Sequence, residues 1–225
     1  MDLGGKSGMK LTNDMLLTLA QSCGFSVADP EEVRQMKVSG MKFHIRTFKA
    51  PELGHISVME AVGFFGLMKM DTLIITPTEK DMPLFSYDRV LAMGNDTLIF
   101  ELYDTLLGET DLSGLEEVKK SAAYLPDHDL GEHWYDSIKL PQSLSKKGKK
   151  KQSGEFDITA IHYLAQYLKC AKNAAACDAQ PKREKASVYV EGLLTNGGPS
   201  TDVFKKGIGE EKTASLFRKV LFATE

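Results

Sequence analysis

Five short strand-like runs between positions 42 and 103 limit most strongly what this chain can fold into. They lie at 42–47, 54–62, 69–76, 84–93 and 97–103, and they have the length and the β-branched or aromatic content of strands. The connections between them hold only three to seven residues, whereas a parallel crossover needs about a dozen or more. The runs therefore predict antiparallel neighbours, with the first strand ending or bulging at Phe48.

Helical patterns flank these runs and supply a cover for the predicted sheet. The 84–93 run is apolar on both of its faces, so both faces of the sheet must be covered. Residues 12–14 offer caps for a helix that Gly24 ends, Asp157 can cap a long helix, Pro181 can open another, and a final helix spans 210–222. The apolar ridge of the long helix consists of Ile158, Ile161, Leu164, Ala165, Leu168 and Ala171. The polar stretch 145–154 predicts a loop, and the whole pattern predicts an α+β fold.

Charge is distributed unevenly along the chain. The 225 residues carry 28 basic and 31 acidic side chains, a net charge of −3, which argues against a general nucleic-acid binder. Positions 1–137 carry 12 basic and 22 acidic residues, whereas positions 138–225 carry 16 and 9. An acidic partner would therefore meet the C-terminal part, where the lysine run 146–151 is either a solvated loop or a docking site.

The same composition indicates a cytoplasmic protein. Three scattered cysteines are too few for a disulfide framework, which favours a reducing compartment. No apolar stretch approaches the roughly 20 residues of a membrane span, so we expect no membrane partner. Residues 1–10 lack a secretory signal and are expected to form a disordered leader before a single domain at 11–225.

The familiar cofactor and metal motifs do not occur in the sequence. No G-x-G-x-x-G opens a helix, so nothing points to a dinucleotide site. His128 and His133 are five residues apart, with no cysteine nearby, and a polar surface loop explains them better than a metal site. We expect no metal.

Two carboxylates in strand-like runs are the most informative anomaly. Asp88 shares a strand face with Leu84 and Val90, and Glu60 shares one with Ile56. Acidic side chains are seldom buried unpaired, because the charged form loses its hydration. Either they pair with Arg89 or another cation, or they line a ligand cleft where a raised pKa lets each donate a proton.

Segments at both ends of this region resemble the ferredoxin-dependent bilin reductases. The run MPLFSYDRV at 82–90 is similar to the family pattern LP-x-FG-x-D-x-V and follows a strand that ends in Pro77. Gly209-Glu210-Glu211, with Phe217 and the VLF at 220–222, is similar to the closing FGEEW…VLF signature. Between them, the Leu-Pro pairs at 125–126 and 140–141 bracket a stretch of the family's length. The resemblance runs from about residue 41 to 222.

The resemblance implies a fold and a reaction. The family has a three-layer α/β/α sandwich with a central antiparallel sheet flanked by helices, and it binds biliverdin or a related linear tetrapyrrole between the sheet and the C-terminal helices. It holds no metal or organic cofactor. Reduced ferredoxin, an acidic protein, supplies single electrons, and the enzyme supplies protons to bilin radicals. The resemblance also favours a monomer, located in the plastid stroma if the source is a photosynthetic eukaryote.

The resemblance also assigns roles to individual residues. Asp88 matches the central proton-donating aspartate, and Glu60 matches a glutamate that helps some members reduce a vinyl group. Thr72, or Asp71 with an earlier gap, stands where the family has a histidine. Lys139 is the candidate for pairing with a substrate propionate.

A second departure from the family lies at 195–200. Members usually show a segment like N-D-P-A-R there, and its second aspartate aligns with Gly198. Asn196 in this segment is a further candidate for binding substrate. Without the histidine and this aspartate, a single two-electron reduction or an altered regiochemistry is expected.

Three functions therefore remain open from the sequence. The first is ferredoxin-dependent reduction of biliverdin or a related tetrapyrrole. The second is a bilin-binding protein on the same fold that has lost turnover. The third is a reductase of another open-chain tetrapyrrole, such as a chlorophyll or heme catabolite.

Overall fold

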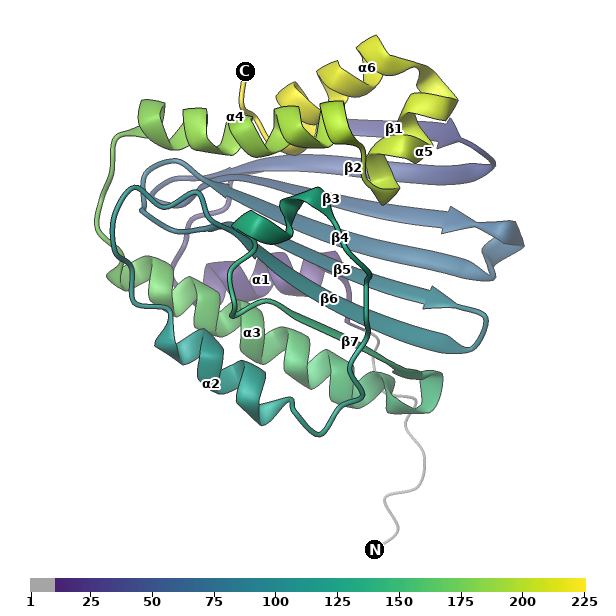
Figure 1. Ribbon diagram of the computed structural model, residues 1–225, viewed down its shortest axis with the longest axis horizontal. Coiled ribbons are helices and arrows are strands. Elements are labelled where there is room, and N and C mark those ends of the chain that lie inside the picture. Colours follow the sequence, from purple (N-terminus) through teal and green to yellow (C-terminus); the bar gives the residue numbers. More distant parts are fainter. Residues whose placement is uncertain (1–10) are drawn as a thin grey trace, which may run out of the picture.

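A seven-stranded antiparallel sheet, with its strands in sequence order, forms the centre of the molecule (Figure 1). The computed structural model describes residues 11–225, so the leader expected at 1–10 lies outside the described residues. The strands are β1 Glu32–Val38, β2 Met41–Ala50, β3 Gly54–Gly63, β4 Met68–Pro77, β5 Leu84–Ala92, β6 Asn95–Tyr103 and β7 Leu144–Lys149. β2 to β6 confirm the five predicted runs and their antiparallel pairing.

Two details of the predicted sheet are wrong. β2 continues through Phe48 to Ala50 without a bulge. The strand face that carries Phe48 is partly exposed to solvent near the start of β2, but at Phe48 it is buried in the core. The stretch 145–154 is not a loop: β7 covers its first part, and a helix begins at Ser153. Lys146 can lie buried in β7 because its ammonium donates to the Leu125 carbonyl at 3.0 Å and pairs with Asp127 at 2.7 Å.

Helices cover both faces of the sheet, which gives an α+β fold of three layers (Figure 1). One face packs against α1 Asn13–Ser22, α2 Ser113–Ser121 and α3 Ser153–Asn173. The other packs against α4 Ala179–Asn196, α5 Pro199–Ile208, α6 Glu210–Ser215 and a π-helical segment at Leu216–Leu221. None of the helices within 11–225 is long and apolar enough to cross a membrane.

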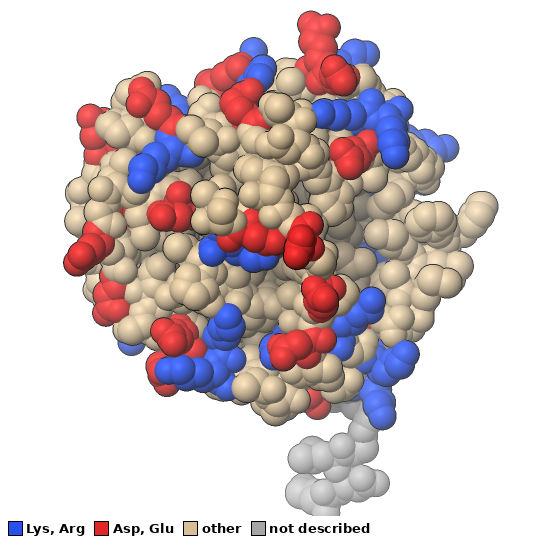
Figure 2. Space-filling view, in the orientation of Figure 1, with Lys and Arg blue, Asp and Glu red and all other residues tan. Residues whose placement is uncertain are grey.

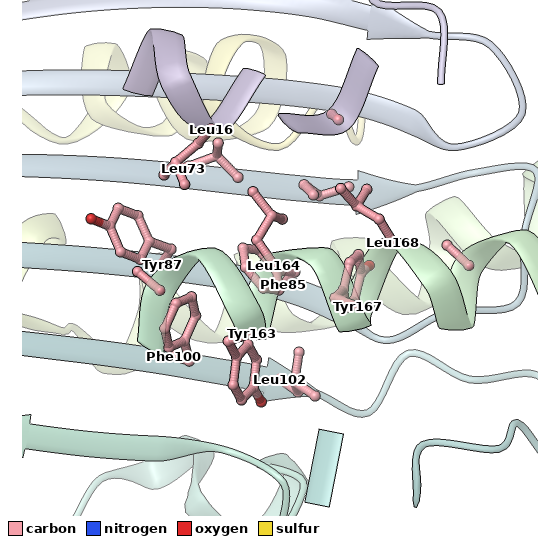
Figure 3. Close-up of a cluster of buried hydrophobic side chains, with 14 of the residues drawn as sticks. Leu16, Leu73, Phe85, Tyr87, Phe100, Leu102, Tyr163, Leu164, Tyr167 and Leu168 are labelled. Atoms are coloured by element: carbon pink, nitrogen blue, oxygen red, sulfur yellow. The ribbon is translucent and has the colours of Figure 1, made fainter. Parts of the chain in front are cut away.

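The core between the sheet and α3 is rich in aromatic rings (Figure 3). Phe100 of β6 stacks on Tyr163 of α3 with ring centroids 4.2 Å apart, and Phe85 of β5 packs against Tyr167 at 4.7 Å. The Tyr167 hydroxyl donates to the Pro83 carbonyl at 2.8 Å, so its polar end is satisfied inside the core. These contacts fix α3 against the centre of the sheet.

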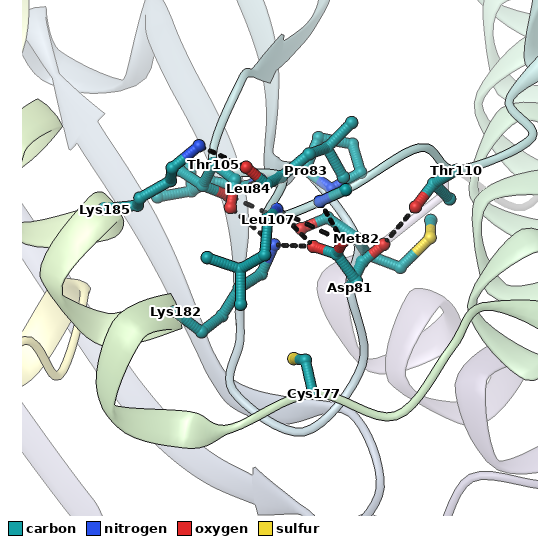
Figure 4. A network of polar contacts seen from close by, with 12 residues as sticks. Asp81, Met82, Pro83, Leu84, Thr105, Leu107, Thr110, Cys177, Lys182 and Lys185 are labelled. Carbon is teal, nitrogen blue, oxygen red and sulfur yellow. Dashed lines mark hydrogen bonds and ion pairs between the residues drawn. The ribbon is translucent and has the colours of Figure 1, made fainter.

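The second helical layer is attached to the sheet by polar contacts. One set of contacts, which we call the polar clamp, joins Lys182 of α4 to Asp81 and Thr105 (Figure 4). The Lys182 ammonium lies 2.9 Å from the Asp81 carboxylate and donates to the Thr105 carbonyl at 2.7 Å. In β3, His55 Nε2 lies 2.8 Å from the Val220 carbonyl, and the Ser57 hydroxyl donates to the Leu221 carbonyl at 2.8 Å. The π-helical segment and α4 are thereby held over the sheet face that carries Asp88.

Candidate functional site

A hollow of about 260 Å³ lies between the sheet and the layer formed by α4 to α6. Side chains of β3 to β6 form one side, and residues of α4, the start of α5 and the π-helical segment form the other. Most of the lining is apolar or aromatic. The polar exceptions on the sheet and the facing loop are Thr72, Ser86, Asp88, Glu101 and His133. A largely apolar hollow with a few convergent polar groups is typical of a small-molecule site.

Strand register explains which residues meet in the hollow. Met59 in β3 pairs with Thr72 in β4, Thr72 with Asp88 in β5, and Asp88 with Ile99 in β6. Residues opposite one another in paired strands point to the same face. These four side chains therefore form one row across the sheet, and all four line the hollow.

Asp88 is the central acid of this row. The Thr72 hydroxyl donates to Asp88 Oδ1 at 2.5 Å, and the Ser86 hydroxyl lies 3.4 Å from Oδ2. Burial raises the pKa of Asp88 to about 6, against the opposing effect of the Thr72 hydrogen bond, and the nearby charge of Glu101 adds to the rise. An acid with this pKa holds a proton over part of the neutral range and can donate it to a bound ligand.

Glu101 is a second carboxylate in the hollow and is more deeply buried than Asp88, and sequence reasoning did not identify it. Its Oε2 accepts a hydrogen bond from the Tyr103 hydroxyl at 2.6 Å, and its Oε1 lies buried without a hydrogen-bond partner within the described chain. Lys139 Nζ is 3.7 Å from Oε1. The signal was present in the sequence, because Glu101 shares a strand face with Ile99 and Tyr103 in an apolar strand, as Asp88 does with Val90.

Aromatic rings gather where the end of β6 meets α4 and the segment at 133–135. Tyr103 stacks on Tyr189 of α4 with centroids 4.0 Å apart, and it meets the ring of Tyr135 edge-on at 5.6 Å. His133 stacks on Tyr135 at 4.8 Å. The neighbouring Trp134 donates its indole N–H to the Gly197 carbonyl at 3.0 Å, which ties this loop to the end of α4. Flat, apolar surfaces of this kind suit a planar conjugated ligand.

Glu60 lies on the opposite face of the sheet, which corrects the expectation that it shares a cleft with Asp88. Its Oε1 accepts from Arg46 at 2.8 Å and from the Asn13 amide at 3.1 Å, and Oε2 lies 3.2 Å from His44. The pleat turns successive residues to opposite faces, so the position beside Thr72 belongs to Met59. For Glu60, the pairing alternative is the one that the structure supports.

Arg89, the cation considered as a partner for Asp88, also faces away from the hollow. It pairs with Asp96 and lies 3.3 Å from Asp157, beside the ring of Phe156. Among the described residues, Asp88 therefore has hydroxyl neighbours and no guanidinium neighbour. Within residues 11–225 no cluster of three or more His, Cys, Asp or Glu side chains is arranged to hold a metal ion.

The other predicted site residues fall at different distances from Asp88. Thr72 contacts it directly, and Gly198 lines the same hollow. Lys139 lines an adjoining hollow of about 230 Å³ that shares Glu101 and Leu130 with the first, and its ammonium pairs with Asp136 at 2.5 Å. Asn196 is exposed at the end of α4 and does not line the hollow.

The comparisons with known proteins support the fold. No family model matches the chain, and no curated protein matches its sequence. Among solved structures, phytochromobilin synthase from tomato, in complex with biliverdin, superposes with a TM-score of 0.71 at 14% sequence identity. The match covers 94% of this chain and 83% of that one. The chain described here therefore has the fold of a protein whose structure was solved with biliverdin.

Proposed function

We propose that this protein is an oxidoreductase that reduces biliverdin or a related linear tetrapyrrole, with Asp88 as the proton donor. The observation that carries the proposal is the placement of a carboxyl with a pKa of about 6 in an aromatic-lined hollow. The shared fold with a biliverdin-bound synthase supports the same ligand class. The resemblance of the segments at 82–90 and 209–222 points to the same family of reactions.

The chemistry of the lining suits such a ligand. Pyrrole rings are flat and apolar on their faces, and Tyr135 and Tyr189, which line the hollow, offer aromatic surfaces for them. The adjoining hollow lengthens the site beyond Asp88, as an open-chain molecule of several rings requires. Lys139 is the proposed partner of a substrate propionate. To bind the propionate, the Lys139 ammonium would give up its ion pair with the carboxylate of Asp136.

The proposed reaction adds two electrons and two protons across one double bond. Reduced ferredoxin is the proposed donor and delivers the electrons one at a time. Asp88 gives its proton to the radical formed by the first electron, solvent returns a proton to the carboxylate, and Asp88 gives this second proton to the bilin after the second electron arrives. With Thr72 beside Asp88 in place of an imidazole, and Gly198 in place of a second acid, one such two-electron step is the expected extent of reaction.

Anaerobic turnover tests this proposal. Purified protein is mixed with biliverdin, ferredoxin, its reductase and NADPH, and the bilin absorption spectrum is followed. We expect a new bilin spectrum with wild type and with Asp29→Asn, which removes an exposed carboxylate outside the hollow. A spectrum that stays unchanged with wild type, at protein in excess over bilin, would contradict the proposal.

A non-catalytic bilin-binding protein is the second candidate. The specific observation in its favour is that Thr72, whose hydroxyl does not titrate near neutral pH, stands next to Asp88. Tight biliverdin binding without ferredoxin-driven reduction would select this function. Reduction of other open-chain pigments, but not of biliverdin, would instead select a reductase of a chlorophyll or heme catabolite.

A further inference from the structure

Large apolar side chains project into solvent at one end of the sheet. The turns that join β1 to β2, β3 to β4 and β5 to β6 lie together at this end, on the right of Figure 1. Phe64 is 67% exposed and Phe65 109% in the β3–β4 turn, and Met93 is 90% exposed in the β5–β6 turn. Figure 2 shows tan side chains, which are neither acidic nor Lys or Arg, protruding from this edge, with Lys and Arg side chains nearby.

The fold itself does not account for the two phenylalanines. Their φ angles are 50° and 55°, in the left-handed region that bulky residues avoid and that Gly and Asn tolerate. The short helical turn Phe64–Gly66 contains no buried residue. Strained residues that also expose their rings indicate a contact outside the chain.

Lysines stand in a row beside these apolar side chains. Lys37 pairs with Lys42 across β1 and β2, Lys42 with Val62 in β3, and Val62 with Lys69 in β4. Like charges directly opposite in a sheet repel one another. Within the described part of the chain, none of the three lysines is in an ion pair. The row is therefore a basic strip whose ammonium groups have no ion-pair partner among residues 11–225.

A hollow joins the basic strip to the apolar tips. It has a volume of about 550 Å³, and it is lined by Lys37 and Lys42 on one side and by Phe64 and Phe65 on the other. A ligand that fits it has an anionic group next to an apolar body. This is the chemistry of an anionic phospholipid headgroup with the start of its acyl chains.

We propose that this end of the sheet docks the protein on an anionic phospholipid membrane. The turn surface, as we call it, consists of Phe64, Phe65, Leu67 and Met93 together with Lys37, Lys42 and Lys69. The ammonium groups bind lipid phosphates, and the apolar side chains enter the headgroup region. Aromatic and aliphatic side chains next to lysines are the usual composition of such an interfacial surface.

The shape of the turn surface favours a membrane over other occupants. A protein partner needs a matching cavity for each protruding side chain to reach good complementarity, whereas a fluid lipid interface closes around any convex shape. A second copy of this chain, docked by two-fold symmetry, would bring two rows of lysines against each other. This proposal departs from the sequence-based expectation of no membrane partner, which rested on the lack of a spanning segment, because a peripheral contact needs no such segment.

Vesicle co-sedimentation tests the proposal. The purified protein is centrifuged with vesicles of phosphatidylcholine alone, or of phosphatidylcholine with phosphatidylglycerol, at low and high salt. We expect binding only to the anionic vesicles and weaker binding at high salt. Lys42→Gln and Lys69→Gln should each weaken binding about fivefold.

The decisive variant is Phe64→Asn with Phe65→Asn. Asn accepts the left-handed backbone, so this variant should fold with an unchanged or higher Tm, while vesicle binding weakens at least about tenfold. The matched control replaces two exposed apolar residues elsewhere, Val188→Ser in α4 and Ile158→Ser in α3, and should bind as wild type does.

Three results would overturn the proposal. The first is a wild-type protein that does not sediment with anionic vesicles, and the second is binding that the double Phe variant leaves intact. The third is a double Phe variant that changes only the oligomeric state, or only the affinity for an acidic protein, since the turn surface would then bind another protein. None of these measurements depends on bilin turnover.

Discussion

At the scale of the residue, the chemistry proposed for the site depends on how the carboxyl of Asp88 is held. Asp88 was identifiable from the sequence because an acid in a strand apolar on both faces needs an explanation, and Glu101 carries the same signal. Glu60 was misplaced for a physical reason: alternation assigns faces within one strand, but only the register between strands says which faces coincide. No local pattern distinguishes Met59 from Glu60 as the neighbour of Thr72.

The raised pKa of Asp88 predicts a gain in stability when its charge is removed. The folded-state pKa of about 6 lies above the usual 3.8, so the folded state binds the extra proton and the free energy of unfolding falls as pH rises from about 4 to 6. Asp88→Asn should therefore be more stable than wild type at pH 7, by about 1–3 kcal/mol. Urea denaturation at pH 4 and pH 7 measures this, and a variant destabilised equally at both pH values would contradict it.

The two neighbours of Asp88 should shift its titration in opposite directions. Glu101→Gln removes a negative charge that raises the pKa of Asp88, so its pKa should fall. Thr72→Val removes a hydrogen bond that stabilises the carboxylate, so its pKa should rise. Infrared titration of the Asp88 carboxyl, with Asp88→Asn as the blank, gives both values. Shifts in the same direction would show that the environment of Asp88 is misassigned.

At the scale of the element, the sequence predicted the central strands well and the edges poorly. β3 to β6 have strong apolar patterns because both faces are covered, and β2 alternates clearly, whereas β1 is exposed at most of its positions and half of the residues in β7 are lysines. The ridge predicted for α3 was also partly wrong. Ile158 is 56% exposed, while Phe156, Tyr163 and Tyr167 are buried, because tertiary packing turned the aromatic face inward.

Removing either charge of the polar clamp between α4 and the loops around the sheet should lower the free energy of unfolding, but by different amounts. Asp81→Asn leaves the ammonium of Lys182 buried with the Thr105 carbonyl as its neutral partner, and should cost about 3–5 kcal/mol. Lys182→Met should cost less, because Asp81 keeps the amides of Leu107 and Gly108.

Urea denaturation of both variants and of the double variant tests this order. The exposed pair of Lys120 with Glu117 supplies the control, since Lys120→Met should leave the free energy of unfolding nearly unchanged. The double variant should recover part of the loss of Asp81→Asn. Equal costs for the two single variants would contradict the asymmetry.

At the scale of the whole molecule, the site forms between the sheet and one helical layer, and no single segment builds it. The hollow exists because the residues after α4 and the π-helical segment stand over the row of Met59, Thr72, Asp88 and Ile99. Strand order was predictable from the short connections between strands. Helical cover was predictable from the run that is apolar on both of its faces. The position of the aromatic loop at 133–135 was not, because it depends on long-range contacts with α4.

The proposed electron donor gives a prediction at the same scale. Lys147, Lys149, Lys150 and Lys151 are exposed at the end of β7, whereas Lys146 is buried and belongs to the fold. Changing these four exposed lysines to Gln should raise the KM for ferredoxin about tenfold at low salt, with less effect at high salt. Lys120→Gln is the control. An unchanged KM and salt dependence would place the docking site elsewhere.

Electron paramagnetic resonance tests most directly whether Asp88 is the proton donor. Asp88→Asn is mixed anaerobically with biliverdin and reduced ferredoxin, and the resonance and absorption spectra are recorded together. Without its proton donor, the variant should bind the pigment, accept one electron and accumulate an organic radical, while wild type proceeds to a reduced bilin without a lasting radical signal. Wild-type turnover that is matched by Asp88→Asn, with no radical in either sample, would show that Asp88 is not the proton donor.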